Sequence, residues 1–424
     1  HSGCNGSGLP AGNGWTDADC KIKTWHEIFD FIAKGITADC ARPSDTLAAE
    51  KYFSDAHVVR KMIRFFRVCG RELREVFVGA DDSVRPSIYH NIFHHSLNSG
   101  GTTYMNITVI GCGRWGSLIT WYLDRTGHQV TLYGRPESAR MQRFLTDRSN
   151  DLLTLPESVA LSTDLACVQD AEVIIISIGS QSLRGLMEEL RPMALRDKTF
   201  VLCMKGLEIG TGERLSQVAR EYLDSSNAIA VWLGPGHVQE FYRGVPNCMV
   251  IDSENADVKQ RLVREFSSDL IRFYYGSDLL GNEVGAAAKN VVGIAAGFLD
   301  GLGLVTLKGA LMSRGTREVA RLIRAMGGNE LSAYGLCHLG DYEATVFSPY
   351  SHNRQFGECY VQGKSYTQLA EGYYTVKALV QLGKQYGVEL PICQSVYHIL
   401  YENADPHEAI RLLMGRDLKG EFDS

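Results

Sequence analysis

One short stretch constrains the fold of this chain more than any other: residues 106–122, NITVIGCGRWGSLITWY. An apolar run that ends at Ile110 is typical of a buried strand. Three glycines spaced as GxGxxG follow it, then a helical pattern, and then a second apolar run at 129–133. A strand, a glycine turn, a helix and a strand in this order predict a βαβ unit, which is typical of a mainly parallel sheet covered on both faces.

In this setting the glycine spacing indicates a dinucleotide-binding turn. Gly111 would permit the tight turn, Gly113 would let the backbone approach a pyrophosphate, and Gly116 would let helix and strand pack closely. The first helical residues, Arg114 and Trp115, lie where free N–H groups and the positive end of the helix dipole face an anion. We therefore predict that NADPH or NADH binds here.

The end of the second strand bears on which of the two cofactors is used. An NAD-selective site usually carries Asp or Glu there to hold the ribose 2′-hydroxyl. This strand ends in Leu132-Tyr133-Gly134-Arg135-Pro136, with no acid. The guanidinium of Arg135 can face a 2′-phosphate or stack on adenine, so the sequence favours NADPH, or the use of both cofactors.

The rest of the chain divides into two regions by its pattern of apolar residues. Further short apolar runs, separated by helical stretches, lie at 173–178, 199–203, 228–232 and 248–251. After about Tyr275 only helical patterns continue. We predict an α/β fold: a doubly wound, Rossmann-type domain at 105–276 and an all-helical domain at 277–424.

Residues 1–104 fit neither domain and are expected to be a helical extension of unknown function. Helical patterns lie near 25–32 and 58–73. The second is rich in Arg and Lys, which suits a solvated face or, alternatively, docking on an acidic partner. His90 and His94 have the i, i+4 spacing of metal ligands, but no Cys or carboxylate lies beside them, so no metal site is predicted.

Bulk properties exclude some classes of protein. The net charge of −6 argues against a nucleic-acid-binding protein. No apolar stretch approaches the roughly 20 residues that span a bilayer. Eleven cysteines without a CxxC pair indicate reduced thiols and a cytoplasmic location. A disulfide among Cys4, Cys20, Cys40 and Cys69 stays open as an alternative.

Several motifs carry a resemblance to a known family. Residues 105–424 resemble the bacterial NAD(P)-dependent glycerol-3-phosphate dehydrogenases over their whole length. The motifs, in order, are GCGRWG (111–116), MKGLE (204–208), GPGHVQE (234–240), EVGAAAKNVVGIAAGFLDGLG (283–303), RGTRE (314–318), GLCHLGD (335–341), SHNRQFG (351–357) and EGYYTVKAL (371–379).

The resemblance implies both a fold and an activity. The all-helical domain is expected to be of the 6-phosphogluconate-dehydrogenase-like type. The activity is the reduction of the small molecule dihydroxyacetone phosphate to sn-glycerol 3-phosphate for glycerophospholipid synthesis. The resemblance also implies a homodimer.

Lys289 is the expected proton donor. It lies in an apolar helical run, Ala286 to Asn290, where burial would lower the pKa of an amine toward neutrality. It also matches the catalytic lysine of the family. Asp300 falls on the same helix face, but about 16 Å away on a straight helix. The resemblance instead implies Asp341 as the acidic partner.

The resemblance also implies two sets of binding residues, with Lys205 contacting both substrate and cofactor and acting with Lys289 and Asp341 in catalysis. The substrate set is Lys205, Gly234, Gly236, Lys289, Asn290, Asp341, Thr345, Ser351, His352 and Asn353. The cofactor set is Gly111, Gly113, Arg114, Trp115, Gly116, Arg135, Lys205, Val238, His352, Leu369 and Glu371.

The chain departs from the family pattern at three places. Gly236 stands where Ser or Thr is usual, and residues 304–307 replace a turn one residue longer. His352 stands where the family has an arginine that helps to hold the substrate phosphate, and imidazole cannot form a bidentate fork. Either Arg354 or Lys205 supplies the missing charge, or the substrate differs.

Two other functions stay open on the sequence. One is a related NADPH-dependent reductase of another 2-keto or 3-hydroxy compound, which His352 would support. The other is a non-enzymatic NADPH-binding sensor. A sensor has no need of Lys289 and Asp341, so the sequence favours an enzyme.

Overall fold

The computed structural model describes residues 104–418 and 420–421 of the 424. The helical patterns expected near 25–32 and 58–73, and the histidines at 90 and 94, lie outside the described residues.

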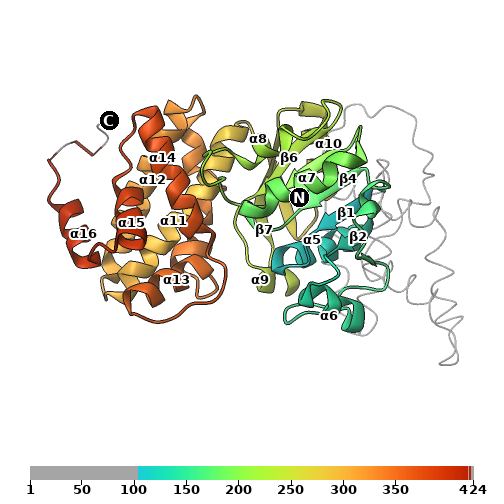
Figure 1. Ribbon diagram of the computed structural model, residues 1–424, viewed down its shortest axis with the longest axis horizontal. Coiled ribbons are helices and arrows are strands. Elements are labelled where there is room, and N and C mark those ends of the chain that lie inside the picture. The colour runs from blue at the N-terminus through green and yellow to red at the C-terminus, as the bar shows by residue number, and fades with distance from the viewer. Residues whose placement is uncertain (1–103, 419, 422–424) are drawn as a thin grey trace, which may run out of the picture. The chain divides into compact units, whose positions relative to one another are not determined.

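One eight-stranded sheet organises the first part of the described chain (Figure 1). Its strand order is β3-β2-β1-β4-β5-β6-β7-β8. The strands from β3 to β6 in this order run parallel, β7 is antiparallel to β6, and β8 is parallel to β7. The strands are β1 (Asn106–Ile110), β2 (Gln129–Tyr133), β3 (Ala160–Ser162), β4 (Val173–Ile176), β5 (Thr199–Leu202), β6 (Ala228–Leu233), β7 (Asn247–Ser253) and β8 (Ile271–Tyr275).

All six apolar runs of the sequence form strands, and two strands were not predicted. The first, β3, has only three residues, all at least partly exposed, at one edge of the sheet. The second, β8, lies at the other edge, where Arg272 and Tyr274 alternate with buried Ile271 and Phe273. Neither strand is a continuous apolar run, because an edge strand is not enclosed on both faces.

Helices cover both faces of the sheet, as the strand pattern predicts. In β4 the side chains of Val173 and Ile175 pack into one apolar cluster, and those of Ile174 and Ile176 pack into another. The alternation places the clusters on opposite faces, since successive side chains of a strand point to opposite sides. The helices are α5 (Arg114–Arg125), α6 (Ala139–Asp147), α7 (Leu183–Leu190), α8 (Leu215–Arg220), α9 (Val238–Tyr242) and α10 (Ala256–Phe266). Short 3₁₀ turns lie at Leu165–Val168, Ser180–Ser182 and Arg191–Met193.

The second part of the described chain is helical throughout. Its helices are α11 (Leu279–Gly301), α12 (Lys308–Ala325), α13 (His352–Val361), α14 (Glu371–Tyr386), α15 (Pro391–Glu402) and α16 (Pro406–Met414). Between them lie 3₁₀ turns at Val305–Leu307, Glu330–Tyr334 and Leu339–Asp341 and a π-helical turn at Glu343–Phe347. No helix of the described chain is both long and apolar enough to cross a bilayer.

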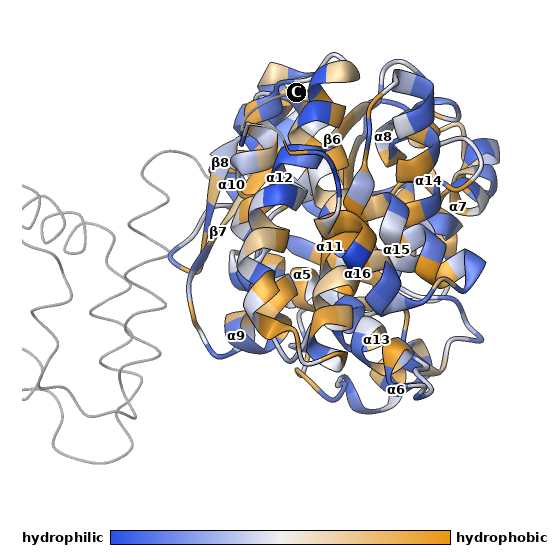
Figure 2. Ribbon diagram, turned by 90° about the vertical axis from the view of Figure 1, so that its left-hand side faces the viewer, coloured by the Kyte–Doolittle hydropathy of each residue, from blue (hydrophilic) through white to orange (hydrophobic). Residues whose placement is uncertain are grey.

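The central element of this part is α11. Every residue from Glu283 to Leu299 is buried, and Figure 2 shows orange, apolar positions along this helix. A helix that is apolar all round must be enclosed by others, and α11 packs against α12, α13, α14 and α15.

Two glycines bring α11 very close to α13. A Cβ at Gly297 would lie 2.0 Å from the carbonyl oxygen of Arg354, and one at Gly357 would lie 2.2 Å from that of Ile294.

Candidate active site

The topology of the sheet marks where a ligand is expected. After β1 the chain moves outward to β2 and β3, and then returns to place β4 on the other side of β1. In open α/β sheets, ligands bind in the crevice beyond the carboxyl ends of the strands at such a reversal. Gly111 follows β1 and Gly179 follows β4, so both turns lie at this crevice.

The glycine turn after β1 fits a dinucleotide. The φ angle of Gly111 is +116°, and a Cβ there would lie 2.2 Å from the carbonyl oxygen of Ser177. A Cβ at Gly116 would lie 1.9 Å from the carbonyl oxygen of Gly111. At Gly113, by contrast, the nearest atom would be 3.8 Å away, on Arg140. Two glycines are therefore required by the packing of the turn itself, and the third faces open space at the start of α5, where a pyrophosphate would lie.

Glu371 and Leu369 reach the same crevice from the helical part. Glu371 is the first residue of α14, and its carboxylate accepts hydrogen bonds from the backbone N–H of Ser180, at 3.0 Å, and from the Ser180 hydroxyl. A Cβ at Gly179 would lie 3.8 Å from both Leu369 and Glu371. Burial raises the pKa of Glu371, while its bonds to Ser180 act in the opposite direction.

Arg135, Trp115 and Val238, also of the expected cofactor set, contact other residues of the chain. Arg135 lies just after β2 and forms an ion pair with Glu189 at 2.5 Å. Trp115 packs against Phe241, with 6.0 Å between ring centroids. Val238 is buried in the same apolar cluster as Phe241. Trp115 and Val238 thus help to fix the walls of the crevice from within the core.

Lys289 lies in the middle of α11 and is buried, with 8% of its surface exposed. Its Nζ donates to the Thr345 hydroxyl at 2.8 Å and lies 2.9 Å from Oδ2 of Asp341. The Thr345 hydroxyl in turn donates to the backbone carbonyl of Asp341 at 2.7 Å. The ammonium group is therefore held in one orientation from two sides.

Lys205 comes to the same carboxylate from the sheet. It lies just beyond β5, and its Nζ is 2.6 Å from Oδ2 of Asp341 and 2.7 Å from the carbonyl oxygen of Gly234. Asp341 is almost fully buried, with 1% exposed. One carboxylate oxygen is thus shared by two lysines, one from each part of the chain.

The surroundings of Lys289 shift the pKa of its amine. The pKa of Lys289 is lowered to about 8, chiefly because the amine is buried; Asp341 acts to raise this pKa and Lys205 acts to lower it. A shift of this kind, caused by desolvation and specific charges in a crevice, is typical of functional sites. Near neutral pH this amine is protonated and close to its pKa, as a proton donor needs to be.

A chain of amides links the helices around this cluster. Asn290 donates to the backbone carbonyl of Lys205 at 2.9 Å. Asn353 donates to the Asn290 side chain at 3.0 Å and accepts from the backbone N–H of Gly372 at 2.9 Å. Ser351 caps α13 through the N–H of Arg354. The expected substrate residues 290, 351 and 353 therefore set the positions of α11, α13 and α14 relative to one another.

The loop after β6 explains why residue 236 is glycine. The φ angle of Gly236 is +145°, and a Cβ there would lie 2.2 Å from the ring of Phe241. Serine or threonine would be both strained and blocked at this position. Gly234, at +128°, places its carbonyl oxygen against Lys205.

His352 meets an unexpected partner. Its Nε2 lies 2.6 Å from Nη1 of Arg114, the first residue of α5. Arg354, which the sequence offers as a replacement cation, is instead bound to Asp300 at 2.6 Å, to Glu358 at 3.0 Å and to the Ser348 carbonyl. Asp300 also binds Lys308 at 2.6 Å, so its partners are Lys308 and Arg354 and not Lys289.

Sequence reasoning did not single out His237, which lies in the GPGHVQE motif. Its Nε2 is buried and has no hydrogen-bond partner among the described residues. Burial lowers its pKa, with opposing contributions from Glu240 and Asp341 and a further lowering by Lys289, so the ring lies near the lysine–aspartate cluster. A buried polar atom without a partner in such a place is available to a ligand.

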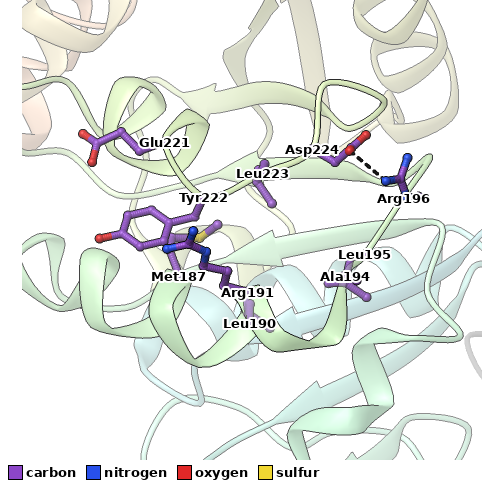
Figure 3. A pocket seen from close by; sticks show the side chains of 10 residues that line it. All are labelled: Met187, Leu190, Arg191, Ala194, Leu195, Arg196, Glu221, Tyr222, Leu223 and Asp224. Atoms are coloured by element: carbon purple, nitrogen blue, oxygen red, sulfur yellow. Dashed lines mark ion pairs between the residues drawn. The ribbon is translucent and has the colours of Figure 1, made fainter.

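One other cavity of the described residues lies away from this site. A cavity of about 240 Å³ is lined by Met187, Arg191, Arg196, Glu221 and Asp224, among others (Figure 3). Its lining segments precede β5 and β6, so it lies at the amino ends of these strands, at the opposite edge of the sheet. No group of three or more His, Cys, Asp or Glu side chains within 104–418 is placed to hold a metal ion.

A glycine turn at the switch point of the sheet, combined with a buried lysine on a separate helical part, defines a class: the two-part, dinucleotide-dependent dehydrogenases. Family models confirm the class and narrow it. Residues 106–259 match the N-terminal model, and residues 278–411 the C-terminal model, of NAD-dependent glycerol-3-phosphate dehydrogenase. The chain belongs to this family.

Individual relatives agree with the family models. Glycerol-3-phosphate dehydrogenase [NAD(P)+] of Thermoanaerobacter sp. is 35% identical over 332 residues, which cover 75% of this chain and 99% of the relative. The corresponding protein of Prosthecochloris aestuarii is 36% identical over 334 residues, 75% and 100% of the two chains. The crystal structure of glycerol-3-phosphate dehydrogenase from Coxiella burnetii superposes with a TM-score of 0.69 at 27% identity, covering 74% of this chain and 99% of that one.

Proposed function

We propose that this chain is an NAD(P)-dependent glycerol-3-phosphate dehydrogenase that reduces dihydroxyacetone phosphate to sn-glycerol 3-phosphate. The observation that carries the proposal is the buried Lys289 ammonium, held by Asp341 and Thr345 at 2.9 and 2.8 Å. Curated relatives at about a third sequence identity have this activity as their name. The product is a precursor for glycerophospholipid synthesis.

The cofactor would lie across the glycine turn. Gly111, Gly113 and Gly116 would cradle the pyrophosphate at the start of α5, and Glu371 and Leu369 would lie beside it at Gly179. When bound, NADPH or NADH supplies a hydride to the C2 carbonyl carbon of the substrate. The absence of an acid at the end of β2 supports the use of NADPH. Arg135 supports it too, because its ion pair with Glu189 is exposed and leaves the guanidinium accessible to a 2′-phosphate.

The residues of the chain supply the proton and hold the substrate. Lys289 would donate its proton to the carbonyl oxygen as negative charge develops there, and its ammonium would stabilise that charge beforehand. Asp341 and Thr345 orient the ammonium by taking hydrogen bonds from it. Lys205 would place a second positive charge toward the substrate, with Asn290 and Asn353 framing the site.

The test is NADPH consumption, followed by absorbance, with dihydroxyacetone phosphate and then with unphosphorylated dihydroxyacetone. We expect turnover with the phosphate ester and a much higher KM without the phosphate. The Lys289→Ala variant should lose activity by a factor of about 10² or more while still binding NADPH. Near-normal turnover by this variant would overturn the role of Lys289. Better turnover of unphosphorylated 2-keto compounds would instead favour a related reductase.

Four further expectations are part of the proposal. The division of the chain into 1–104, 105–276 and 277–424 is supported by the confinement of strands to 106–275 and by the compactness of residues 103–424 as a unit. A homodimer, which light scattering would test, is supported by the family resemblance alone. A cytoplasmic location is supported by seven free cysteines in the described part of the chain. The role in phospholipid synthesis follows from the product.

A further inference from the structure

A chain of four polar side chains crosses from the sheet to the helical part beside the glycine turn. Arg114 Nη1 lies 2.6 Å from His352 Nε2, and His352 Nδ1 lies 2.6 Å from the Tyr366 hydroxyl. The Tyr366 hydroxyl donates to Oε1 of Gln355 at 3.0 Å. Tyr366 belongs to the segment between α13 and α14 and was not singled out in the sequence.

The donor and acceptor groups fix the direction of each hydrogen bond in this series of side chains. A guanidinium has only N–H donors, so His352 Nε2 must present its lone pair to Arg114. A neutral imidazole then carries its single proton on Nδ1, which donates to the oxygen of Tyr366. The hydrogen of Tyr366 is directed to Gln355. Each of the three hydrogen bonds that link these four side chains therefore joins a donor to an acceptor.

The surroundings stabilise these protonation states. Burial lowers the pKa of His352, and the charge of Arg114 lowers it further. Burial raises the pKa of Tyr366 to about 12. The Tyr366 ring packs edge-on against Phe356, with centroids 6.1 Å apart, which holds the hydroxyl in place. Near neutral pH the imidazole is uncharged and the phenol is protonated.

We propose that Tyr366 is a positioning residue: by accepting the Nδ1 hydrogen of His352 it stabilises the tautomer that Arg114 requires, and so holds the Arg114 guanidinium in place as a phosphate-binding cation. The inference rests on the proposed function, in which both ligands carry phosphate. Arg114 begins the helix that follows the glycine turn, and His352 adjoins Asn353, whose side chain reaches Asn290 next to Lys289. The guanidinium thus joins the helix that follows the glycine turn to the start of α13, the helix that also carries Asn353.

Arg114 thus stands in for the cation that residue 352 lacks. Arg354 cannot do so while Asp300 and Glu358 hold it. The contact with His352 uses one of the five N–H donors of Arg114, and others can meet phosphate oxygens in the paired geometry that guanidinium favours. The phosphate is either that of the substrate or the pyrophosphate of the cofactor, and the experiment distinguishes them.

The first test removes the positive charge of residue 114 and then restores a positive charge at residue 352. Arg114→Ala should raise either the KM for dihydroxyacetone phosphate or the Kd for NADPH, the latter measured by fluorescence titration, by roughly 10- to 100-fold. The quantity that changes identifies the phosphate. The double variant Arg114→Ala with His352→Arg should recover much of the loss. Arg125→Ala, at the exposed end of the same helix, is the matched control and should change neither quantity.

The second test addresses Tyr366 by a route that does not depend on turnover. Long-range ¹H–¹⁵N NMR correlations of the imidazole, assigned with a His352→Asn variant, should show the Nδ1–H form in the cofactor-free protein. Tyr366→Phe removes only the hydroxyl, and it should give a mixture of tautomers and a smaller rise, about threefold to tenfold, in the same constant as Arg114→Ala. Tyr386→Phe, an exposed tyrosine, serves as control.

The outcomes separate this inference from the proposed function. If the enzyme reduces dihydroxyacetone phosphate but Arg114→Ala leaves both KM and Kd unchanged, the inference fails and the function stands. An Nε2–H tautomer of His352 in the wild-type protein would also overturn it. If no turnover is found, the tautomer and the Kd for NADPH still decide whether Arg114 is held as described.

Discussion

Asp341 holds Lys289 by two routes at once. Its Oδ2 lies 2.9 Å from the lysine Nζ, and its backbone carbonyl accepts from the Thr345 hydroxyl, to which the same Nζ donates. The side chain sets the charge of the amine, and the main chain sets its direction. A lysine held in this way keeps its orientation when it loses its proton, because both acceptors belong to one short segment of backbone.

The pH dependence of turnover should report this amine. Its pKa, lowered by burial to about 8, means that Lys289 is protonated below that pH and neutral above it. A proton donor must be protonated, so kcat for ketone reduction should be level below about pH 8 and fall about tenfold per unit above it. The reverse oxidation needs the neutral amine and should rise over the same interval. Steady-state rates in both directions check the sign; a reduction rate that keeps rising past pH 9 would contradict it.

Asp341→Asn should shift that profile. The substitution removes the negative charge that Lys289 and Lys205 share, so each ammonium destabilises the other and the pKa of Lys289 falls further. We expect kcat at pH 7 to drop by about 10²-fold and the limb near pH 8 to move lower. Asp300→Asn, in the same helix as Lys289 but paired with Lys308 and Arg354, should leave the limb in place. An unchanged limb in Asp341→Asn would refute the assigned charge balance.

Gly111→Ala should damage the cofactor turn. A side chain there is strained at a φ of +116° and would lie 2.2 Å from the carbonyl oxygen of Ser177. We expect loss of NADPH binding and a lower melting temperature. The matched control is Gly185→Ala, in α7, where a Cβ would have no neighbour within 4 Å; it should stabilise the protein by up to about 1 kcal/mol. Calorimetry would give the melting temperature of both variants, and titration their affinity for NADPH. If the two variants gave the same values, Gly111 would not be required for the cofactor turn.

Arg214→Ala should destabilise the contact between α8 and α11. Glu283 is buried and accepts hydrogen bonds from Arg214 at 2.6 Å and from the N–H and hydroxyl of Ser216. Removing Arg214 leaves a buried charge without its counterion, which costs about 3 kcal/mol or more. Arg416→Ala, which breaks an exposed pair with Glu389, should cost less than about 1 kcal/mol.

The sign of the pH effect distinguishes this cause from a loss of packing. Burial already raises the pKa of Glu283, and loss of Arg214 raises it further. A carboxyl with a raised pKa favours the folded state at low pH and opposes it as the pH increases. The deficit of Arg214→Ala in free energy of unfolding should therefore shrink as the pH is lowered from neutrality. A deficit that stays constant as the pH falls would point to packing instead.

Much of the fold could be predicted from the sequence because its signals are local. Each internal strand is a short apolar run, since both faces are buried, and the glycine turn is read from neighbouring residues. The strands β3 and β8 were missed because edge strands keep partly exposed, mixed faces. The antiparallel direction of β7 was equally hidden, since direction leaves no mark in the composition of a strand.

The site was predictable only in part. Lys289 and Lys205 stand out by their surroundings in the sequence, but their pairing with Asp341 came from family resemblance, because nothing local links these segments. The contact of Arg114 with His352 joins residues 238 positions apart. The alternative expectation for Arg354 failed because the packing of α13 on α11 brings that side chain to Asp300.

The close approach of α11 and α13 has a consequence for changing what this enzyme accepts. At Gly297 and Gly357 the two helices touch main chain to main chain, so no side chain acts as a spacer that could be trimmed or enlarged. The distance between Lys289 on α11 and His352 at the start of α13 is therefore set by backbone contacts and not by side chains. In laboratory evolution toward bulkier ketones, we expect the mutations that enlarge the site to lie in the connecting loops. Mutations that separate α11 from α13 should instead prevent folding.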